Sequence, residues 1–568
     1  MRATASRNGF DVRAIGGSHT VLLAIDATKE ARKGLLGFAL KRTGAGRSSW
    51  LRGLKVFQDV VPNPKPGCSY SSLEHPIQSF LWGYYGAEPG SAYEFIVRPV
   101  YGVPGDLRYG DDVTLTIRTE NEDEGTHAVF FNRGAIASQA FAEKFGNQGP
   151  KNDSDPKDPV TAWLSRGLLE AALHFINDTR AGETLRVAAY EFSYPAILDA
   201  LRAAHDRDVD IIVVYEAGKE TVKGKRQDTS ATTANRKAIK AAGLPDDMLR
   251  KRTKRNAIPH NKFMVRLSDD ESRVAVWTGS TNFTSSGFLG QTNVGHIVRD
   301  RALAQKYIAY WKQLADDAEW QGLRDWNEAN DPNPAGATAA DSIVDIFSPR
   351  RNDLMLDWYA KRIGSAAGAV MFTAAFGVNE KLAPALAKKK PFLRFLLMEK
   401  PLSGKTKPLL SHNPDIVLAN GAALGKQTIK AKIPGWKLDK WFLDEGHYRY
   451  EGHVFYIHTK VLLIDPLSDD PLVISGSANF SKNSLVNNDE NMLIVRGNTR
   501  IADIYMTEFD RIFRHFYFRD IANKLALEKR PQKKIIFLDP TDGWVNENFG
   551  ARRLKSKRRK MFFPKSKN

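Results

Sequence analysis

Two histidine–lysine pairs recur along the chain, each within an apolar run. His260 and Lys262 stand in PHNKFMV, and His458 and Lys460 stand in YIHTKVLLI. Side chains of a β-strand alternate between its faces, so each histidine should point to the same side as its lysine. Two ionisable groups on one face of a buried strand are costly unless that face meets something polar. The spacing therefore predicts that both pairs face a site for a polar or charged ligand.

The pentapeptide Gly-Ser-x-Asn-Phe also occurs twice, each time at the end of a second apolar run. From histidine to asparagine the distance is 22 positions in the first copy and 21 in the second. Such a pentapeptide should arise by chance at roughly one position in 10^5. Its occurrence twice, in one order and at nearly one spacing, indicates an internal duplication. The residues concerned are Gly279, Ser280 and Asn282 in the first copy and Gly476, Ser477 and Asn479 in the second.

These residue types fit the transfer of a phosphoryl group. A neutral imidazole can attack phosphorus, and a protonated one can protonate the departing oxygen, so two facing histidines supply a nucleophile and an acid. Lysines and asparagines supply donors for the non-bridging oxygens, which carry the developing charge. We expect this set to need neither a metal ion nor a cofactor.

The two copies resemble the signature of the phospholipase D superfamily, which is His-x-Lys, four residues, Asp, and then Gly-Ser-x-Asn. The second copy is complete, because Asp465 follows its lysine at the family's spacing. The first copy has Leu267 at that position and Asp269 two residues later. In the family this aspartate lies outside the reacting groups, so we interpret the loss as a structural variation. The resemblance covers residues 160–520 and implies a phosphodiesterase that forms a covalent phosphohistidine.

The residue eleven positions after the asparagine differs between the copies: it is Asn293 in the first and Glu490 in the second. A carboxylate bonded to an imidazole N–H makes the other ring nitrogen a better nucleophile, whereas an amide orients the ring without that charge. The tyrosyl-DNA phosphodiesterases, a branch with similar spacing, place such partners against the opposite half. By that resemblance Glu490 serves His260 as nucleophile, and Asn293 serves His458 as proton donor. Ser280, Ser477 and Asn293 are predicted to bind substrate, and Asp465, Gly279 and Gly476 to be structural.

The chain divides into an all-β region followed by two α/β halves. Residues 1–145 carry short apolar runs broken by Gly, Pro and Asp, which predicts a β-sandwich of immunoglobulin or fibronectin type. Residues 146–159 are a polar linker. Helix and strand patterns alternate in 160–332 and again in 343–530, which predicts two pseudo-symmetric phospholipase D-like halves, each a mixed sheet flanked by helices. Residues 531–568 are expected to be a basic C-terminal tail.

Composition limits the partners. The 568 residues have a net charge of +18, which favours polyanions such as nucleic acid or an anionic lipid surface. No window reaches the roughly 18 consecutive apolar residues of a membrane span, and no secretory signal is recognisable. We therefore predict a cytoplasmic protein without a membrane span, for which contact with a membrane surface is one alternative and contact with nucleic acid the other. A single cysteine, Cys68, excludes an intramolecular disulfide. Because both copies lie in one chain, we expect a monomer.

Three charged or aromatic segments have alternative uses. Arg552 to Lys560 holds seven basic residues in nine, either as a solvated tail or as a phosphate or membrane contact with Phe562 and Phe563 as anchors. The basic run 250–255 is either a solvated loop or a guide for phosphates. Five aromatic residues before the second copy have three alternative uses, which are packing in a core, stacking on a base or insertion into a membrane interface. They are Trp436, Trp441, Phe442, Tyr448 and Tyr450.

Three functions stay open at this point. Cleavage or transfer of phospholipids, as in the phospholipases D, is slightly favoured over an endonuclease that acts on DNA or RNA, because nucleases of the superfamily commonly carry one copy and dimerise. The third function is a catalytically silent module that binds lipid or nucleic acid, and the two intact His-Lys-Asn sets weigh against it. The sequence names no ligand for the N-terminal sandwich.

Overall fold

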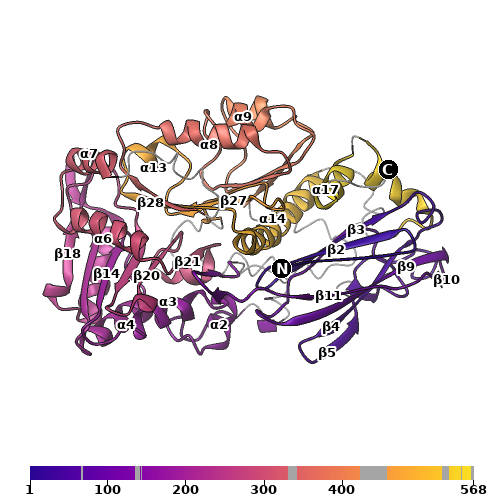
Figure 1. Ribbon diagram of the computed structural model, residues 1–568, viewed down its shortest axis with the longest axis horizontal. Helices are drawn as coiled ribbons and strands as arrows, with labels where there is room; N and C mark the ends of the chain where they lie inside the picture. Colours follow the sequence, from indigo (N-terminus) through magenta and orange to yellow (C-terminus); the bar gives the residue numbers. More distant parts are fainter. Residues whose placement is uncertain are drawn as a thin grey trace.

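The computed structural model describes residues 1–65, 68–134, 141, 144–146, 148–330, 342–421, 457–527, 537–551 and 553–563, with the backbone alone for 521–527. Figure 1 shows a β-sandwich and two α/β units arranged around the long helix α14 (Thr499–Leu527). Side chains from all three units meet this helix in one core, among them Ile15 of the sandwich, Val129, and Leu463 of the last sheet. The helix is therefore the common support of the three units.

The N-terminal unit is an antiparallel β-sandwich, as predicted. One sheet has the strand order β1-β2-β3-β8 and the other β10-β9-β4-β5, with β11 also paired to β9. In β11 (Val113–Arg118) every second side chain is buried, which is the pattern of a strand with one face in the core. The remaining strands are β1 (Arg2–Arg7), β2 (Phe10–Gly16), β3 (Val21–Ala27), β4 (Gly37–Gly44), β5 (Arg47–Trp50), β8 (Leu81–Tyr84), β9 (Ala92–Val103) and β10 (Asp106–Tyr109), besides the small ribbon β6 (Arg52–Gly53) and β7 (Tyr70–Ser71).

The border between the sandwich and the first half lies earlier than expected. Strands β12 (Asp123–Glu124) and β13 (His127–Phe131) were predicted to belong to the sandwich, which was expected to end at residue 145. Instead, β13 pairs with β21 (Val294–Val298) of the first half. The reason is its composition: four of the five residues in HAVFF are buried, and such a strand needs cover on both faces.

The first half is a mixed sheet of eight strands in the order β12-β13-β21-β20-β19-β14-β15-β18. Strands β14, β15 and β18 are parallel, and the others pair antiparallel. Alternate side chains of β14 and β19 face opposite layers: Val187 and Met264 join α3 and α4, whereas Ala188 and Phe263 join α6. The strands are β14 (Thr184–Ala189), β15 (Asp210–Glu216), β18 (Leu249–Arg252), β19 (Lys262–Leu267) and β20 (Ala275–Gly279), and the helices are α2 (Pro159–Ser165), α3 (Leu168–Asn177), α4 (Pro195–His205), α5 (Ser230–Ala242), α6 (Arg301–Ala315) and α7 (Trp320–Asn330).

The second half repeats this plan with seven strands in the order β22-β28-β27-β26-β23-β24-β25. Strands β23, β24 and β25 are parallel, and β23 pairs antiparallel with β26, as β14 does with β19. The prediction of two pseudo-symmetric α/β halves is thus confirmed. The strands are β22 (Ile343–Ser348), β23 (Val370–Ala374), β24 (Arg394–Met398), β25 (Ile416–Asn420), β26 (Val461–Ile464), β27 (Leu472–Gly476) and β28 (Glu490–Arg496), and the helices are α8 (Leu354–Ser365), α9 (Ala383–Ala387), α10 (Thr406–Leu410), α13 (Lys482–Val486) and α14.

The predicted linker 146–159 lies against the first half over its described residues. The Asp153 carbonyl accepts a hydrogen bond from the Tyr194 hydroxyl, and the Asp153 carboxylate accepts one from Ser285 Oγ at 2.5 Å. A short β-ribbon, β16 (Lys219–Val222) and β17 (Lys225–Asp228), stands apart from the main sheets. None of the described helices combines the length and the apolar character needed to cross a membrane.

The C-terminal residues fold onto the sandwich, so that the expected basic tail is not a free tail over the described positions. The segment contains η5 (Asp542–Val545), α16 (Asn546–Phe549) and α17 (Leu554–Phe562). Trp544 is part of the sandwich core, and its Nε1 donates to the Leu35 carbonyl at 2.8 Å.

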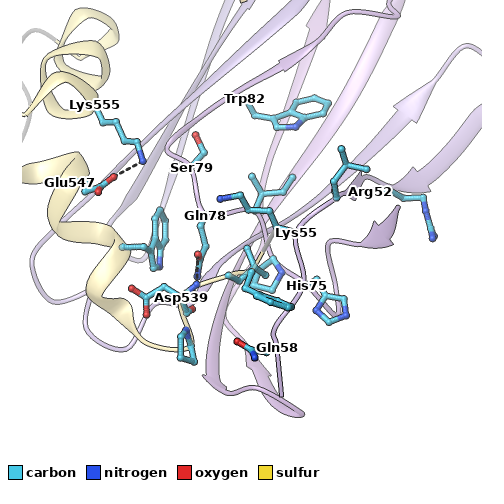
Figure 2. A pocket seen from close by; sticks show the side chains of 18 residues that line it. Arg52, Lys55, Gln58, His75, Gln78, Ser79, Trp82, Asp539, Glu547 and Lys555 are labelled. Atoms are coloured by element: carbon cyan, nitrogen blue, oxygen red, sulfur yellow. Dashed lines mark hydrogen bonds and ion pairs between the residues drawn. The ribbon is translucent and has the colours of Figure 1, made fainter. Parts of the chain in front are cut away.

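The basic side chains of α17 are accommodated because carboxylates of other units pair with them. Arg559 is buried and pairs with Asp26 of β3, and Arg558 pairs with Asp510 of α14 at 2.7 Å. Phe562 is 4% exposed and packs in the shared core, so it cannot anchor the chain in a membrane as one alternative required. A cavity of about 730 Å³ opens where this segment meets the sandwich, with Lys55, His75, Trp82 and Lys555 among its lining residues (Figure 2).

Candidate active site

The two His-x-Lys copies come together where the halves meet. Each lysine stands at or just before the start of a middle strand, β19 in the first half and β26 in the second. The rings of His260 and His458 face one another with centroids 6.4 Å apart and planes inclined by 73°. The two imidazoles are therefore close enough for one phosphoryl group to contact both. Residues two hundred positions apart therefore form one site.

Glu490 is the partner of the first histidine. Its Oε2 is 2.9 Å from His260 Nδ1 and also accepts from Ser477 Oγ at 2.7 Å, while Oε1 accepts from Asn488 Nδ2 at 2.9 Å. A carboxylate oxygen accepts, so the proton of the imidazole lies on Nδ1 and the lone pair on Nε2. Complete burial raises the pKa of Glu490 to about 7, against the opposing effect of Lys262.

Asn293 is the partner of the second histidine. Its Oδ1 is 2.9 Å from His458 Nδ1 and accepts from Ser280 Oγ at 2.8 Å, while its Nδ2 donates to the Gly287 carbonyl at 2.8 Å. Each half therefore repeats one arrangement, in which a serine holds the group that orients the histidine of the opposite half. The two halves differ in the charge of that group.

The serines and Asn293 are consequently not directed at substrate as the sequence predicted. Ser280, Ser477 and Asn293 are buried, and their side chains bond to one another or to the histidine partners. The structure gives all three an orienting position behind the histidines. Gly279 and Gly476 end β20 and β27 where a Cβ would clash with the carbonyls of Val294 and Asn491. This close approach explains the glycine at both positions.

The two lysines are buried beside the histidines. Lys262 Nζ donates to the His260 carbonyl at 2.6 Å, and Lys460 Nζ donates to the His458 carbonyl at 2.6 Å. Burial lowers the pKa of Lys262 to about 7, and burial together with Lys262 lowers that of Lys460 well below its ordinary value. Burial and the lysines likewise lower the pKa of both histidines. A bound anion would reverse these shifts, because an opposite charge favours the protonated forms.

The two asparagines flank the site but have different surroundings. Asn282 Nδ2 donates to a carboxylate oxygen of Glu191. The side chain of Asn479 has no hydrogen-bond partner among the described residues, and its Oδ1 is buried. Asn479 lines a cavity of about 170 Å³ together with Ala374, Ala375 and Phe376.

Two residues that the sequence did not single out belong to the site. Tyr190 and Glu191 follow β14, next to the strand that carries Lys262. The Tyr190 ring lies 5.2 Å from the His260 ring, and the Lys262 ammonium lies 5.5 Å from its centre. The one available signal was their position at the end of an apolar strand, where α/β sheets place binding residues.

Asp465 lies away from the reacting groups, at the far end of β26. Its carboxylate accepts three backbone N–H groups, those of Ala367 at 2.8 Å, Gly368 at 2.6 Å and Ala369 at 3.0 Å. The aspartate therefore fixes the loop that leads into β23. In the first half Leu267 takes the corresponding position, and Asp269, two residues later, is exposed.

Two arginines of the basic run 250–255 are structural, whereas Lys251 and Lys254 are exposed. Arg252 is fully buried and its Nε donates to Asp489 at 2.8 Å, next to Glu490 in the opposite half. Arg255 pairs with the buried Glu216. The aromatic residues 436–450 lie outside the described part of the chain. Within that part, no group of three or more His, Cys, Asp or Glu side chains converges as a metal site.

The comparisons with known proteins identify the family. The model of the PLD-like domain of cardiolipin synthase matches residues 173–315 and 416–513, which contain both His-x-Lys copies. These two motif-bearing segments belong to this PLD-like domain family. The match confirms the resemblance to the phospholipase D superfamily that was drawn from the paired motifs. No curated protein matches the chain.

Solved structures of this superfamily and of other enzymes are similar to parts of the chain. Phosphatidylserine synthase from Haemophilus influenzae Rd KW20 is 12% identical over 66% of this chain and 94% of its own, with a TM-score of 0.38. Nuc, a phospholipase D family member from Salmonella typhimurium, is 26% identical over 26% of this chain and 86% of its own, with a TM-score of 0.21. Polyphosphate kinase from Porphyromonas gingivalis is 10% identical over 59% of this chain and 46% of its own, with a TM-score of 0.36.

Proposed function

We propose that this chain is a phosphodiesterase that forms a covalent phosphohistidine on His260. The observation that carries the proposal is the pair of facing imidazoles with unequal partners, a carboxylate for His260 and an amide for His458. In each ring Nδ1 is hydrogen-bonded to its partner, so Nε2 is the nitrogen that can contact the phosphorus.

The reaction would take two displacements. His260 Nε2 attacks the phosphorus, the bond from phosphorus to the leaving oxygen breaks, and His458 gives its proton to that oxygen. Water or an alcohol then attacks the phosphohistidine, His458 takes the proton of the attacking hydroxyl, and the bond from phosphorus to His260 breaks. Water yields hydrolysis and an alcohol yields transfer. No other reactant is required.

The lysines and asparagines would hold the phosphoryl oxygens. Lys262 and Lys460 are buried within the site and regain their charge when an anion binds. The Nδ2 group of Asn479 would serve as a further donor to these oxygens. Such preorganised donors stabilise the charge that develops in the transition state.

Phospholipid is the substrate that we favour, and nucleic acid is the second candidate. The cavity beside Asn479 has both polar and apolar walls, and Phe376, one of its apolar residues, is 61% exposed, which suits an acyl-bearing or other apolar group. The net charge of +18 favours nucleic acid as well as an anionic bilayer surface. We also propose that the chain acts as a monomer, because both halves of the site come from one chain, and light scattering would test this.

Trapping of the intermediate tests the mechanism. A diester that is labelled in the retained arm should label the His458→Ala protein stably after a rapid acid-free quench, because the second step lacks its base. The His260→Ala protein should remain unlabelled, and His205→Ala, which changes a histidine on α4 outside the site, should behave like the unmodified protein. Label in His260→Ala but not in His458→Ala would reverse the two roles.

Substrate class is tested by incubation in EDTA with single-stranded DNA, duplex DNA, RNA and vesicles of mixed anionic phospholipids. Cleavage of nucleic acid alone would overturn the phospholipid assignment. Loss of all activity in EDTA would contradict the metal-free mechanism. Tight binding to one of the four without turnover would favour the silent binding module.

A further inference from the structure

The cavity between the sandwich and the C-terminal segment is lined by residues that the paired-histidine site does not use. Its volume of about 730 Å³ is in the range of cavities that hold small organic ligands. One wall comes from residues 52–82 of the sandwich and the other from residues 537–555. The two walls are joined by a backbone hydrogen bond of 2.8 Å from Leu538 N–H to the Val56 carbonyl. The return of the C-terminal segment to the sandwich therefore completes the cavity.

Lys55 gives this cavity a positive charge without a counter-ion. Its ammonium makes no hydrogen bond and no ion pair with any group that the structure describes. The carboxylates of the lining are engaged elsewhere: Glu547 pairs with Lys555 at 2.6 Å (Figure 2), and Asp539 accepts hydrogen bonds from Thr541. Burial in the cavity and the charge of Lys555 lower the pKa of Lys55, against the opposing effect of Glu547. A bound anion would supply the charge that Lys55 lacks.

His75 adds an uncharged donor to the same lining. Its side chain is buried, with 3% of its surface exposed, and its Nδ1 accepts a hydrogen bond from the Phe57 backbone N–H at 3.2 Å. The proton of the neutral ring therefore lies on Nε2. Burial lowers the pKa of His75, with Glu74 opposing the shift, so the neutral form prevails at pH 7. The Nε2–H group has no acceptor among the described residues and is available to a ligand.

Trp82 gives the cavity a flat aromatic wall. Its ring is stacked with that of Tyr84, with centroids 6.3 Å apart and planes inclined by 11°, so its orientation is held from the sandwich. Pro76 and Pro540 add apolar surface to the lining. Aromatic side chains of this kind bind nucleobases by stacking, whatever the base. The cavity thus combines donors for an anion with a surface for a planar ring.

We propose that this cavity binds a mononucleotide, with the phosphate at Lys55 and His75 Nε2 and the base against Trp82. A lysine ammonium is a common point-charge ligand of phosphate, and its bond to an anionic oxygen is of the stronger, charge-assisted kind. A nucleoside meets only the aromatic wall and inorganic phosphate meets only the donors, so each binds more weakly than the nucleotide. The site is separate from the paired histidines and does not depend on the proposed phosphodiesterase function.

Titration calorimetry with AMP, adenosine and inorganic phosphate tests the site on the full chain. We expect AMP to bind at least about tenfold more tightly than either of the others. Lys55→Gln should weaken AMP binding about tenfold and change adenosine binding by less than about twofold, because only the charge contact is lost. Trp82→Leu should weaken both AMP and adenosine about tenfold, because both lose the stacking surface. Lys237→Gln, which changes an exposed lysine on α5, is the matched control and should bind AMP as the unmodified protein does.

Three results would overturn the proposal. The first is the absence of AMP binding to the unmodified protein up to about 1 mM, which decides the matter whatever the variants do. The second is AMP binding of unchanged strength in both Lys55→Gln and Trp82→Leu, since the nucleotide would then lie elsewhere, as at the paired histidines. The third is equal affinity for AMP and inorganic phosphate, because the aromatic wall would then hold no base. None of these results involves turnover of a phosphodiester, so the proposed function is tested separately.

Discussion

Replacing Glu490 by Gln removes the charge beside the proposed nucleophile, His260, and keeps the shape of the side chain at position 490. The carboxylate accepts hydrogen bonds from three donors, His260, Ser477 and Asn488. A glutamine has one acceptor oxygen, so its NH2 group would face a donor. Hydrogen bonds to a charged group contribute about 1.5–3 kcal/mol. If that interaction supports attack by His260, formation of the phosphoenzyme should slow by about 10- to 150-fold.

Stability should not fall with activity in this variant. Burial raises the pKa of Glu490 from its ordinary 4.5 to about 7, which corresponds to roughly 3 kcal/mol. Because the folded-state pKa is the higher one, the ionised carboxylate weakens the fold above about pH 7, and this penalty disappears as the pH falls below 4.5. Glu490→Gln should therefore be at least as stable as the unmodified protein at pH 8.

The assay is the burst of 4-nitrophenolate from bis(4-nitrophenyl) phosphate in a stopped-flow instrument at pH 8, with the thermal midpoint measured in the same buffer. Glu319→Gln, which changes an exposed carboxylate after α6, is the matched control and should leave both quantities unchanged. A burst rate in Glu490→Gln within about threefold of the unmodified protein would refute the reasoning. So would a loss of activity that merely accompanies a lower thermal midpoint.

Three further predictions concern the fold. Arg252→Met should cost about 3–5 kcal/mol in urea unfolding, because it leaves Asp489 buried without its partner; a cost below 1 kcal/mol would contradict this. Asp465→Ala should lower the free energy of unfolding by about 1–3 kcal/mol and leave kcat unchanged, and a large fall in kcat at full stability would give the carboxylate a chemical role. Burial lowers the pKa of His127 to about 4 and that of His296 well below its ordinary value, so the unfolded chain binds protons that the fold excludes. The thermal midpoint should therefore fall as the pH drops below about 6.5, and a flat profile down to pH 5 would count against this pair.

Much of the paired site could be predicted from the sequence, because its parts recur. The same order and spacing of His-x-Lys and Gly-Ser-x-Asn-Phe joined His260 to His458, and an equal offset after the asparagines located Glu490 and Asn293. Glu191 has no such repeat. Its place in the site depends on the pairing of β14 with β19, and a single sequence does not contain that register.

The remaining differences have a similar origin. The segment HAVFF is predicted to be a strand, but its residues do not determine which of the two sheets it joins. In the structure this strand, β13, pairs within the sheet of the first half. The helix α17 reads as a solvated basic segment because its partners are remote in sequence: Asp26 comes more than five hundred residues before Arg559. Local patterns thus indicate the elements, whereas contacts over long sequence distances decide their neighbours.

The insertion of Trp544 into the sandwich has a consequence for synthesis of the chain. The last strand of that unit, β11, ends at Arg118, so more than four hundred residues must be added before this indole reaches the ribosome exit. At about 5–20 residues per second, the interval is roughly 20–90 s. During that time Phe38 and Phe80 lack the ring that later packs against them. The sandwich is therefore translated first but completes its core only after Trp544 has been added. Until then its exposed aromatic side chains are available to chaperones.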